Sequence, residues 1–169
     1  MRLISKSISD TQKIAKILVA KLNRKPVKRV ATVLALEGEL GAGKTVLAKA
    51  IAKQLGVKQT ITSPTFVLMK QYKVPQRANS KMQGARERKK ESDYLPFAFS
   101  SKLLVHIDAY RLKDYRDLEL LGIKEILANP ENLVLIEWSD RVRKITPKSA
   151  IKVHIDHIGE SERVIKVND

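Results

Sequence analysis

Hydrophobic residues recur every three or four positions in two stretches of the chain, a period that predicts amphipathic helices. The first stretch has its apolar positions at Ile14, Ile17, Leu18 and Leu22. A Ser-Asp-Thr sequence at 9–11 supplies N-cap oxygens, so we expect a helix that ends near Asn23. The second stretch has its apolar positions at Leu47, Ala48, Ile51, Ala52 and Leu55. It begins at Lys44, and Gly56 follows where a left-handed C-terminal cap belongs.

Short apolar runs elsewhere in the chain predict β-strands. The runs lie at residues 30–36, 66–74, 103–107 and 132–138. The first and third are almost uninterrupted, which is the pattern of strands buried on both faces. The segment 114–127, between the last two runs, has helical character with a break at Gly122. Residues 150–158 and 163–167 flank a Gly-Glu-Ser turn and predict a β-hairpin with a loop of three or four residues.

These elements predict one α/β domain over residues 1–169, with a mixed, mostly parallel sheet flanked by helices and a C-terminal β-hairpin. One segment, residues 74–102, is too long for an ordinary loop. It carries seven Lys and Arg residues against three Asp and Glu residues. We expect a mobile, basic insertion there, with one short helix around residues 80–90.

Composition narrows the class of protein. The chain has 169 residues, 43% of them hydrophobic, and no Cys, which favours a globular protein without disulfides in a reducing, cytoplasmic setting. No apolar run is long enough to span a membrane, and the N-terminus lacks an export signal, so we expect no membrane partner. The formal net charge of +15 has two interpretations, a polyanionic partner or a solvated basic surface.

The sequence GELGAGKT at 38–45 matches the phosphate-binding pattern G-x-x-x-x-G-K-[ST]. A predicted strand precedes it and a predicted helix follows it, which is the context of a P-loop. Lys44 is expected to reach the β- and γ-phosphates of a nucleotide, and the Thr45 hydroxyl to ligate Mg²⁺. The residues expected to line the nucleotide phosphates are Glu39, Leu40, Gly41, Ala42, Gly43, Lys44, Thr45 and Val46.

Two carboxylates lie at the carboxyl ends of predicted strands, where ligands of α/β sheets bind. Asp108 directly follows the run 103–107, and Glu137 lies at the end of the run 132–138. Mg²⁺ prefers oxygen ligands, so we assign Asp108 and Glu137 to the metal side with Thr45. Glu137 can also orient or activate the attacking water. We therefore predict Lys44, Asp108 and Glu137 as the catalytic group.

Three further features each have two interpretations. Ser63 and Thr65 flank a proline in a loop that either senses the γ-phosphate, as switch loops do, or only turns the chain. Trp138 either belongs to the core or lines the nucleotide pocket. His154 and Asp156 share one strand face, where a surface pair is favoured over a metal site.

The class of P-loop protein depends on further motifs. A guanine-reading Asn-Lys-x-Asp motif is missing from the sequence, which disfavours a GTPase. The motifs that are present resemble, in order, those of the TsaE (YjeE) family: GELGAGKT, SPTF with a following tyrosine, HIDAYRL, LELLGIKEIL and IEWSDRV. The resemblance covers residues 30–142 and fails only at the long basic insertion, where members usually have a short hairpin.

The resemblance implies a bacterial, Mg²⁺-dependent ATPase that supports formation of N6-threonylcarbamoyladenosine at position 37 of tRNAs that read ANN codons. It implies action on the TsaD and TsaB proteins, with ATP hydrolysis resetting their complex, and not transfer of the threonylcarbamoyl group. Thr45 and Asp108 would hold Mg²⁺, Lys44 the phosphates, the loop from Ser63 to Thr65 would switch, and Glu137 with Trp138 would lie near ATP.

Alternatives stay open on the sequence alone. The insertion either contacts tRNA phosphates or is a tolerated surface feature. A P-loop kinase of a small molecule is the second functional hypothesis, and a nucleotide-responsive scaffold with incidental hydrolysis is the third.

Overall fold

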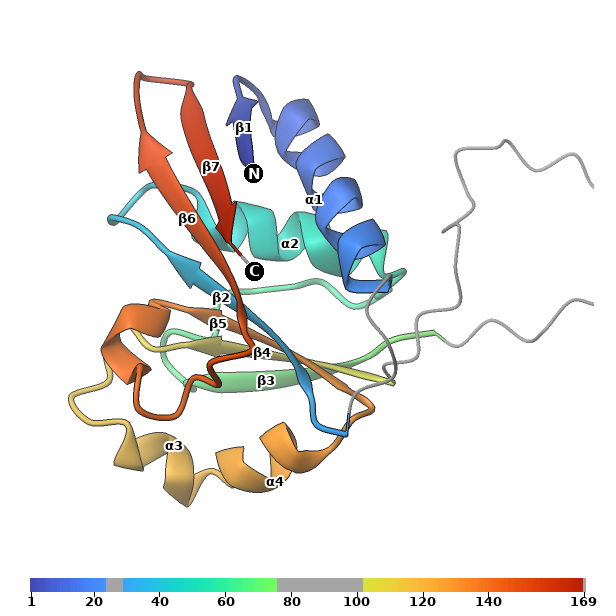
Figure 1. The fold of residues 1–169 in the computed structure, drawn as a ribbon, viewed down its shortest axis with the longest axis vertical. Helices are drawn as coiled ribbons and strands as arrows, with labels where there is room; N and C mark the ends of the chain where they lie inside the picture. Colours follow the sequence, from blue (N-terminus) through green and yellow to red (C-terminus); the bar gives the residue numbers. More distant parts are fainter. Residues whose placement is uncertain (24–28, 76–101, 169) are drawn as a thin grey trace, which may run out of the picture.

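A seven-stranded sheet runs through the computed structural model, which describes residues 1–23, 29–75 and 102–168 (Figure 1). The strand order is β1-β7-β6-β2-β5-β4-β3. The strands are β1 (Arg2–Ser5), β2 (Thr32–Glu37), β3 (Met69–Lys73), β4 (Leu103–Asp108), β5 (Asn132–Glu137), β6 (Ile151–His157) and β7 (Arg163–Asn168). The three central ladders, β6–β2, β2–β5 and β5–β4, are parallel and the three outer ones are antiparallel. The predicted mixed sheet, parallel in its centre, is confirmed.

Helices cover both faces of this sheet (Figure 1). Helices α1 (Ile8–Asn23) and α2 (Lys44–Gln54) lie on one face, and the short helices α3 (Arg116–Leu120) and α4 (Ile123–Ala128) lie on the other. Gly122, with φ of 75°, separates α3 from α4 as predicted. Alternate residues of the buried strands face opposite sides. In β2, Leu34 and Leu36 join the core under α1 and α2, whereas Val33 and Ala35 join the core on the α3–α4 side.

The C-terminal hairpin of β6 and β7 is confirmed. The Ile158 N–H donates to the Glu162 carbonyl oxygen at 3.1 Å, which leaves the three residues 159–161 as the tip. β7 also pairs with β1, a strand that the sequence did not predict. β1 has only four residues, too few for the two-residue alternation to stand out.

The strand predicted at residues 66–74 is shorter in the structure, and most of the predicted insertion lies outside the described residues. β3 begins at Met69 because the preceding residues turn: the Val67 N–H donates to the Pro64 carbonyl, and Leu68 has φ of 62°. Of the insertion predicted at 74–102, residues 76–101 lie outside the described part of the chain. Within the described residues, no helix is long and apolar enough to cross a membrane.

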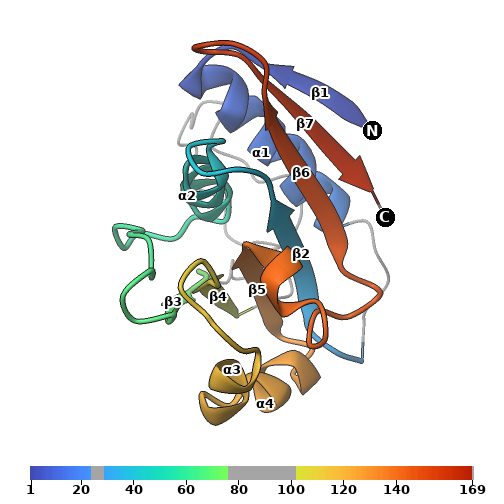
Figure 2. The ribbon, with the colours of Figure 1, turned by 90° about the vertical axis from the view of Figure 1, so that its left-hand side faces the viewer.

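The neighbouring strands β2, β5 and β4 end side by side. β2 leads directly into the turn before α2 (Figure 2). In the ladders, Leu36 lies opposite Glu137, and Glu137 lies opposite Asp108. The topology therefore brings the P-loop, Asp108 and Glu137 together at the carboxyl ends of these strands.

Candidate functional site

The turn from Gly38 to Gly43 follows β2 and has a backbone that requires glycine at its first position. Gly38 has φ of 136°, and a Cβ atom there would lie 2.3 Å from the Ile155 carbonyl oxygen of β6. Gly43, the N-cap of α2, has φ of 102°. The glycines of the motif thus let the turn pack directly against β6 and enter the helix in a left-handed conformation.

The first turn of α2 presents free backbone donors. The first hydrogen bond of the helix runs from the Leu47 N–H to the Gly43 carbonyl at 2.9 Å, so the N–H groups of Lys44, Thr45 and Val46 precede it. Among the described residues, no side chain caps this end by a hydrogen bond, and the first turn holds no acidic residue. These donors, together with the positive end of the helix dipole, suit a phosphate group.

Lys44 lies inside the loop that it follows. Its side chain is nearly buried, at 4% exposed, and its Nζ donates to the carbonyl oxygens of Gly38 at 2.7 Å and Glu39 at 2.8 Å. Nζ also lies 3.6 Å from the centroid of the Trp138 ring. Burial lowers the pKa of the ammonium, and the carboxylates of Glu137 and Asp108 act against that shift.

Glu137 links the P-loop to the interior of the sheet. Its Oε2 accepts a hydrogen bond from the Thr45 hydroxyl at 2.7 Å, and its Oε1 lies 2.7 Å from His106 Nε2. Glu137 and His106 are each 1% exposed. The predicted residues Thr45 and Glu137 are therefore in direct contact, and His106 joins them.

Asp108 is bound to the hydroxyl-rich loop. Its Oδ2 accepts hydrogen bonds from Ser63 Oγ at 3.0 Å and from the Thr65 hydroxyl, and its Oδ1 accepts the Tyr110 N–H at 3.0 Å. The two carboxylates thus have different partners in the structure: Glu137 contacts the P-loop, and Asp108 contacts the loop at Ser63 and Thr65.

Trp138 closes one side of the site. It has φ of 59°, its ring contacts the Lys44 ammonium, and its centroid lies 5.0 Å from that of Tyr110. The guanidinium of Arg141 lies 5.4 Å from the Tyr110 ring centroid and 5.7 Å from that of Trp138. Trp138 also packs against the core on the α3–α4 side, as one of the two sequence interpretations has it, and its place beside a nucleotide stays a prediction.

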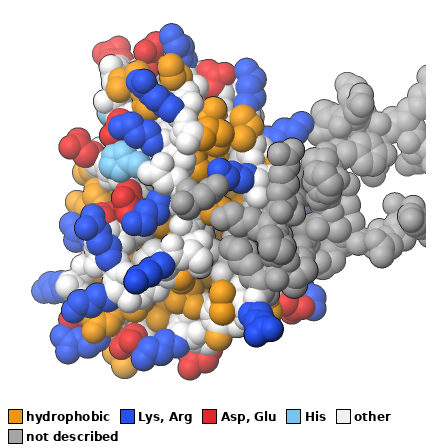
Figure 3. Space-filling model, viewed as in Figure 1, with side chains coloured by type: hydrophobic (Ala, Val, Ile, Leu, Met, Phe, Trp, Pro, Cys, Tyr) orange, Lys and Arg blue, Asp and Glu red, His pale blue; other side chains and the backbone are white. Residues whose placement is uncertain are grey.

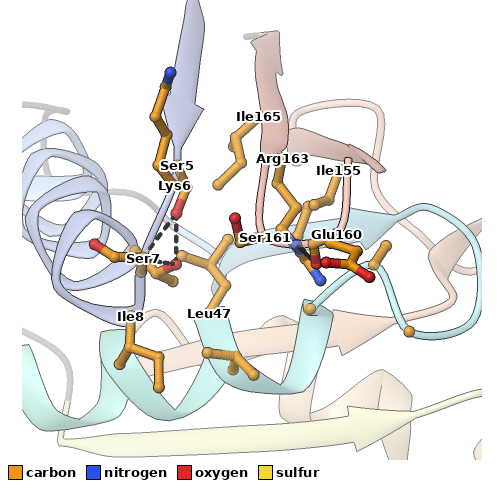
Figure 4. Close-up of a pocket in the computed structure, with 15 residues that line it drawn as sticks. Ser5, Lys6, Ser7, Ile8, Leu47, Ile155, Glu160, Ser161, Arg163 and Ile165 are labelled. Carbon is orange, nitrogen blue, oxygen red and sulfur yellow. Dashed lines mark hydrogen bonds between the residues drawn. The ribbon is translucent and has the colours of Figure 1, made fainter. Parts of the chain in front are cut away.

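A pocket of about 300 Å³ opens beside the P-loop. Ser5 and Ser7 lie on one side, Ser161 and Arg163 of the hairpin on the other, and Leu47 of α2 between them (Figure 4). Gly41, Ala42, Gly43 and Val46 complete the wall next to the phosphate-binding turn. Sequence analysis missed the β1 and hairpin residues because they are distant in sequence and form a wall only when β1 pairs with β7.

His154 and Asp156, the pair predicted to share one strand face, contact each other. His154 Nε2 lies 2.8 Å from Asp156 Oδ1, and Asp156 Oδ2 lies 2.8 Å from Lys166 Nζ. The Lys166 ammonium and His154 lower the pKa of Asp156. His154 and Asp156 line a second pocket of about 480 Å³ that reaches Glu37 and Trp138. Among the described residues, no group of three or more His, Asp or Glu side chains is arranged to hold a metal ion by itself.

The side chains at this site could hold a nucleotide together with Mg²⁺. The hydroxyl of Thr45 and the carboxylates of Asp108 and Glu137 are oxygen donors, the type that Mg²⁺ prefers, and phosphate oxygens commonly complete the coordination of this ion. The residues present therefore fit a Mg²⁺–nucleotide complex better than a protein-only metal site.

Comparisons with known proteins relate the chain to one family. The family model described as "Threonylcarbamoyl adenosine biosynthesis protein TsaE" matches residues 5–83 and 92–165. The chain is 31% identical over 166 residues to a tRNA threonylcarbamoyladenosine biosynthesis protein TsaE of Rickettsia felis, covering 98% of this chain and 78% of the relative. A protein of the same name from Bacillus subtilis is 30% identical over 92% of this chain and 77% of its own length.

One further relative is matched over only part of its length, and one solved structure has a similar fold. The TsaE protein of Haemophilus influenzae is 30% identical over 76% of this chain, and the match spans only 65% of that relative's length. The crystal structure of Bacillus subtilis YdiB superposes with a TM-score of 0.64 at 24% identity, over 99% of this chain and 83% of that one. This structural similarity supports the fold.

Proposed function

Because the chain belongs to the TsaE family of threonylcarbamoyl adenosine biosynthesis proteins, we propose that it is a Mg²⁺-dependent ATPase that acts in the formation of this modified tRNA nucleoside. The observation that carries the proposal is the contact between the P-loop and the end of β5. Thr45 donates to Glu137 across 92 positions of sequence, directly beside the free N–H groups that begin α2.

The phosphates would bind at the first turn of α2. The N–H groups of Lys44, Thr45 and Val46 would donate to phosphate oxygens. The Lys44 ammonium would exchange its bonds to the Gly38 and Glu39 carbonyls for bonds to the β- and γ-phosphates. Its low exposure makes that exchange favourable, because a buried ammonium gains more from an anionic partner than a solvated one does.

Thr45 and Asp108 are the residues that would hold Mg²⁺, with Glu137 beside them. The ion, when bound, would neutralise charge on the phosphates. Asp108 now uses one of its oxygens for the hydroxyls of Ser63 and Thr65, so binding the ion would compete with those bonds. The loop at 62–66 would then be released from Asp108, which gives the proposed switch a physical basis.

Glu137 is the proposed orienting base for the attacking water. Its carboxylate is fixed from two sides, by Thr45 on Oε2 and by His106 on Oε1. A fixed carboxylate can hold a water molecule in one direction with little further loss of entropy.

The 300 Å³ pocket is the proposed site of the nucleoside part of ATP. It adjoins the P-loop at Gly41 to Gly43, and its walls combine apolar and hydroxyl side chains (Figure 4). Leu47 and Ile155 offer apolar contacts for a base, and Ser5 and Thr11 offer hydroxyls.

The TsaD and TsaB proteins are the proposed partners, and hydrolysis would reset their complex. Several large apolar side chains stand exposed around the P-loop and the loop at 62–66, namely Leu40, Val46, Phe66 and Val67. Exposed apolar side chains beside a candidate site favour a protein contact there.

The test is ATP binding followed by Trp138 fluorescence, since this ring contacts the Lys44 side chain. The proposal expects saturable binding that needs Lys44, and release of phosphate that depends on Mg²⁺. A small-molecule kinase would instead consume ATP only when an acceptor is supplied. Saturable binding without phosphate release, with or without TsaD and TsaB, would contradict the ATPase assignment.

A further inference from the structure

His106 lies against Glu137 on the neighbouring strand, in a region closed to solvent. Its Nε2 is 2.7 Å from Glu137 Oε1, and both residues are 1% exposed. Beside an ionised carboxylate, which only accepts hydrogen bonds, Nε2 carries the proton and donates it. Water cannot easily replace this bond at a buried position.

The strands explain how the two side chains meet. β4 and β5 are parallel neighbours, with His106 opposite Leu135 and Asp108 opposite Glu137. Side chains two residues apart share a sheet face. His106 therefore shares the face of Asp108 but lies one step further from the carboxyl end, behind the carboxylates.

The ring has no other polar contact among the residues that the structure describes. Its Nδ1 is buried without a hydrogen-bond partner there. A side chain needed only to fill space would be less costly as an apolar group, because burying an unpaired polar atom costs free energy. Among the described residues, the bond to Glu137 is thus the polar contact that accounts for a hydrogen-bond donor at this position.

We propose that His106 is a positioning residue for ATP hydrolysis, acting through Glu137. By holding Oε1, the imidazole fixes the carboxylate so that Oε2 faces Thr45 and the phosphate site. This inference rests on the proposed ATPase function, and His106, which is 1% exposed, would act only through Glu137.

Two nearly isosteric substitutions separate positioning from packing. His106→Gln keeps an N–H donor near the place of Nε2, whereas His106→Met fills a similar volume without a donor. We expect His106→Met to lower kcat for ATP hydrolysis about 10- to 100-fold, the usual effect of removing a partner that orients a ligating or catalytic group. KM for ATP should change less than about threefold, and His106→Gln should recover most of kcat.

A double-mutant cycle tests the route through Glu137. In a Glu137→Gln background, His106→Met should have no further effect on kcat, because the carboxylate that it orients is already gone. Equal losses in the Gln and Met variants, additive losses in the double variant, or a full kcat in a folded His106→Met protein would each overturn the inference.

A readout that does not use catalysis keeps the inference separate from the proposed function. In ¹⁵N-histidine NMR spectra, His106 should show the Nε2–H tautomer, and its signal should move in the Glu137→Gln variant. A wild-type protein that hydrolyses no ATP under any condition would refute the ATPase proposal. An Nδ1–H tautomer, or a His106 signal that ignores Glu137→Gln, would refute the positioning contact whatever the turnover.

Discussion

At the scale of single residues, Glu137 is the side chain in which the contacts of the site converge. It accepts the Thr45 hydroxyl, lies against His106, and faces Asp108 across the β4–β5 ladder. The motif alone identified Lys44 and Thr45, and strand ends identified Asp108 and Glu137. The sequence could not identify the His106–Glu137 pair, because contact between residues 31 positions apart depends on the register of two strands.

Replacing Glu137 by Gln should strongly lower the rate of ATP turnover without abolishing ATP binding. The amide keeps the size of the carboxylate but is a poor base, so we expect kcat for ATP hydrolysis to fall about 100-fold or more. ATP affinity, followed by Trp138 fluorescence, should stay within about threefold of the wild type. Glu125→Gln, an exposed change on α4, is the matched control and should leave both values unchanged.

The same variant separates an ATPase from a scaffold. If nucleotide binding alone drives assembly, Lys44→Ala should lose association with TsaD and TsaB while Glu137→Gln retains it and the modification still proceeds. Under our proposal, Glu137→Gln should assemble but fail to support repeated rounds of modification. Full activity of the modification system with Glu137→Gln would contradict the need for hydrolysis.

At the scale of elements, the site depends on how the P-loop packs against the C-terminal hairpin. Gly38 contacts β6, and the hairpin tip forms one wall of the 300 Å³ pocket together with the β1–α1 connection. The sequence predicted the hairpin from its turn residues but gave no sign of its place beside the P-loop. The hairpin lies beside the P-loop because β6 pairs in parallel with β2. Pairing between strands that are distant in sequence cannot be predicted from local hydrophobic patterns.

A methyl group at Gly38 should damage this packing. In Gly38→Ala the Cβ would lie 2.3 Å from the Ile155 carbonyl oxygen and the residue would have φ of 136°, so both strain and a backbone clash result. Gly41→Ala is the control, because Gly41 also has a positive φ but no atom within 4 Å of the added Cβ. We expect Gly38→Ala to lower the free energy of unfolding by at least about 1–3 kcal/mol more than Gly41→Ala in urea titrations. Equal stability of the two variants would contradict the described packing.

A bulky residue at the hairpin tip should block the proposed nucleoside pocket. Ser161 lines that pocket, so Ser161→Phe should weaken ATP binding about tenfold or more without lowering the melting temperature (Figure 4). Ile158→Phe places the same ring on an exposed position of the same hairpin, outside the pocket lining. Unchanged ATP affinity in a folded Ser161→Phe protein would place the nucleoside elsewhere.

At the scale of the whole molecule, the sheet brings together motifs that are distant in sequence, namely the P-loop after β2 and the carboxylates at the ends of β4 and β5. Periodicity predicted the helices of both layers and the buried strands between them, because buried strands and amphipathic helices have distinct patterns. The net charge of +15 does not indicate which face of the molecule would bind a polyanion. On the face shown in Figure 3, Lys and Arg side chains alternate with acidic and hydrophobic ones over the part of the chain that is described.

The most direct test of the proposed ATPase function is the rate of phosphate release from ATP by the purified chain with Mg²⁺, alone and with the TsaD and TsaB proteins of the same source. We expect slow release by the chain alone, clear stimulation by the pair, and loss of both with Glu137→Gln. Nucleotide binding without any phosphate release, or release that Glu137→Gln leaves intact, would contradict it.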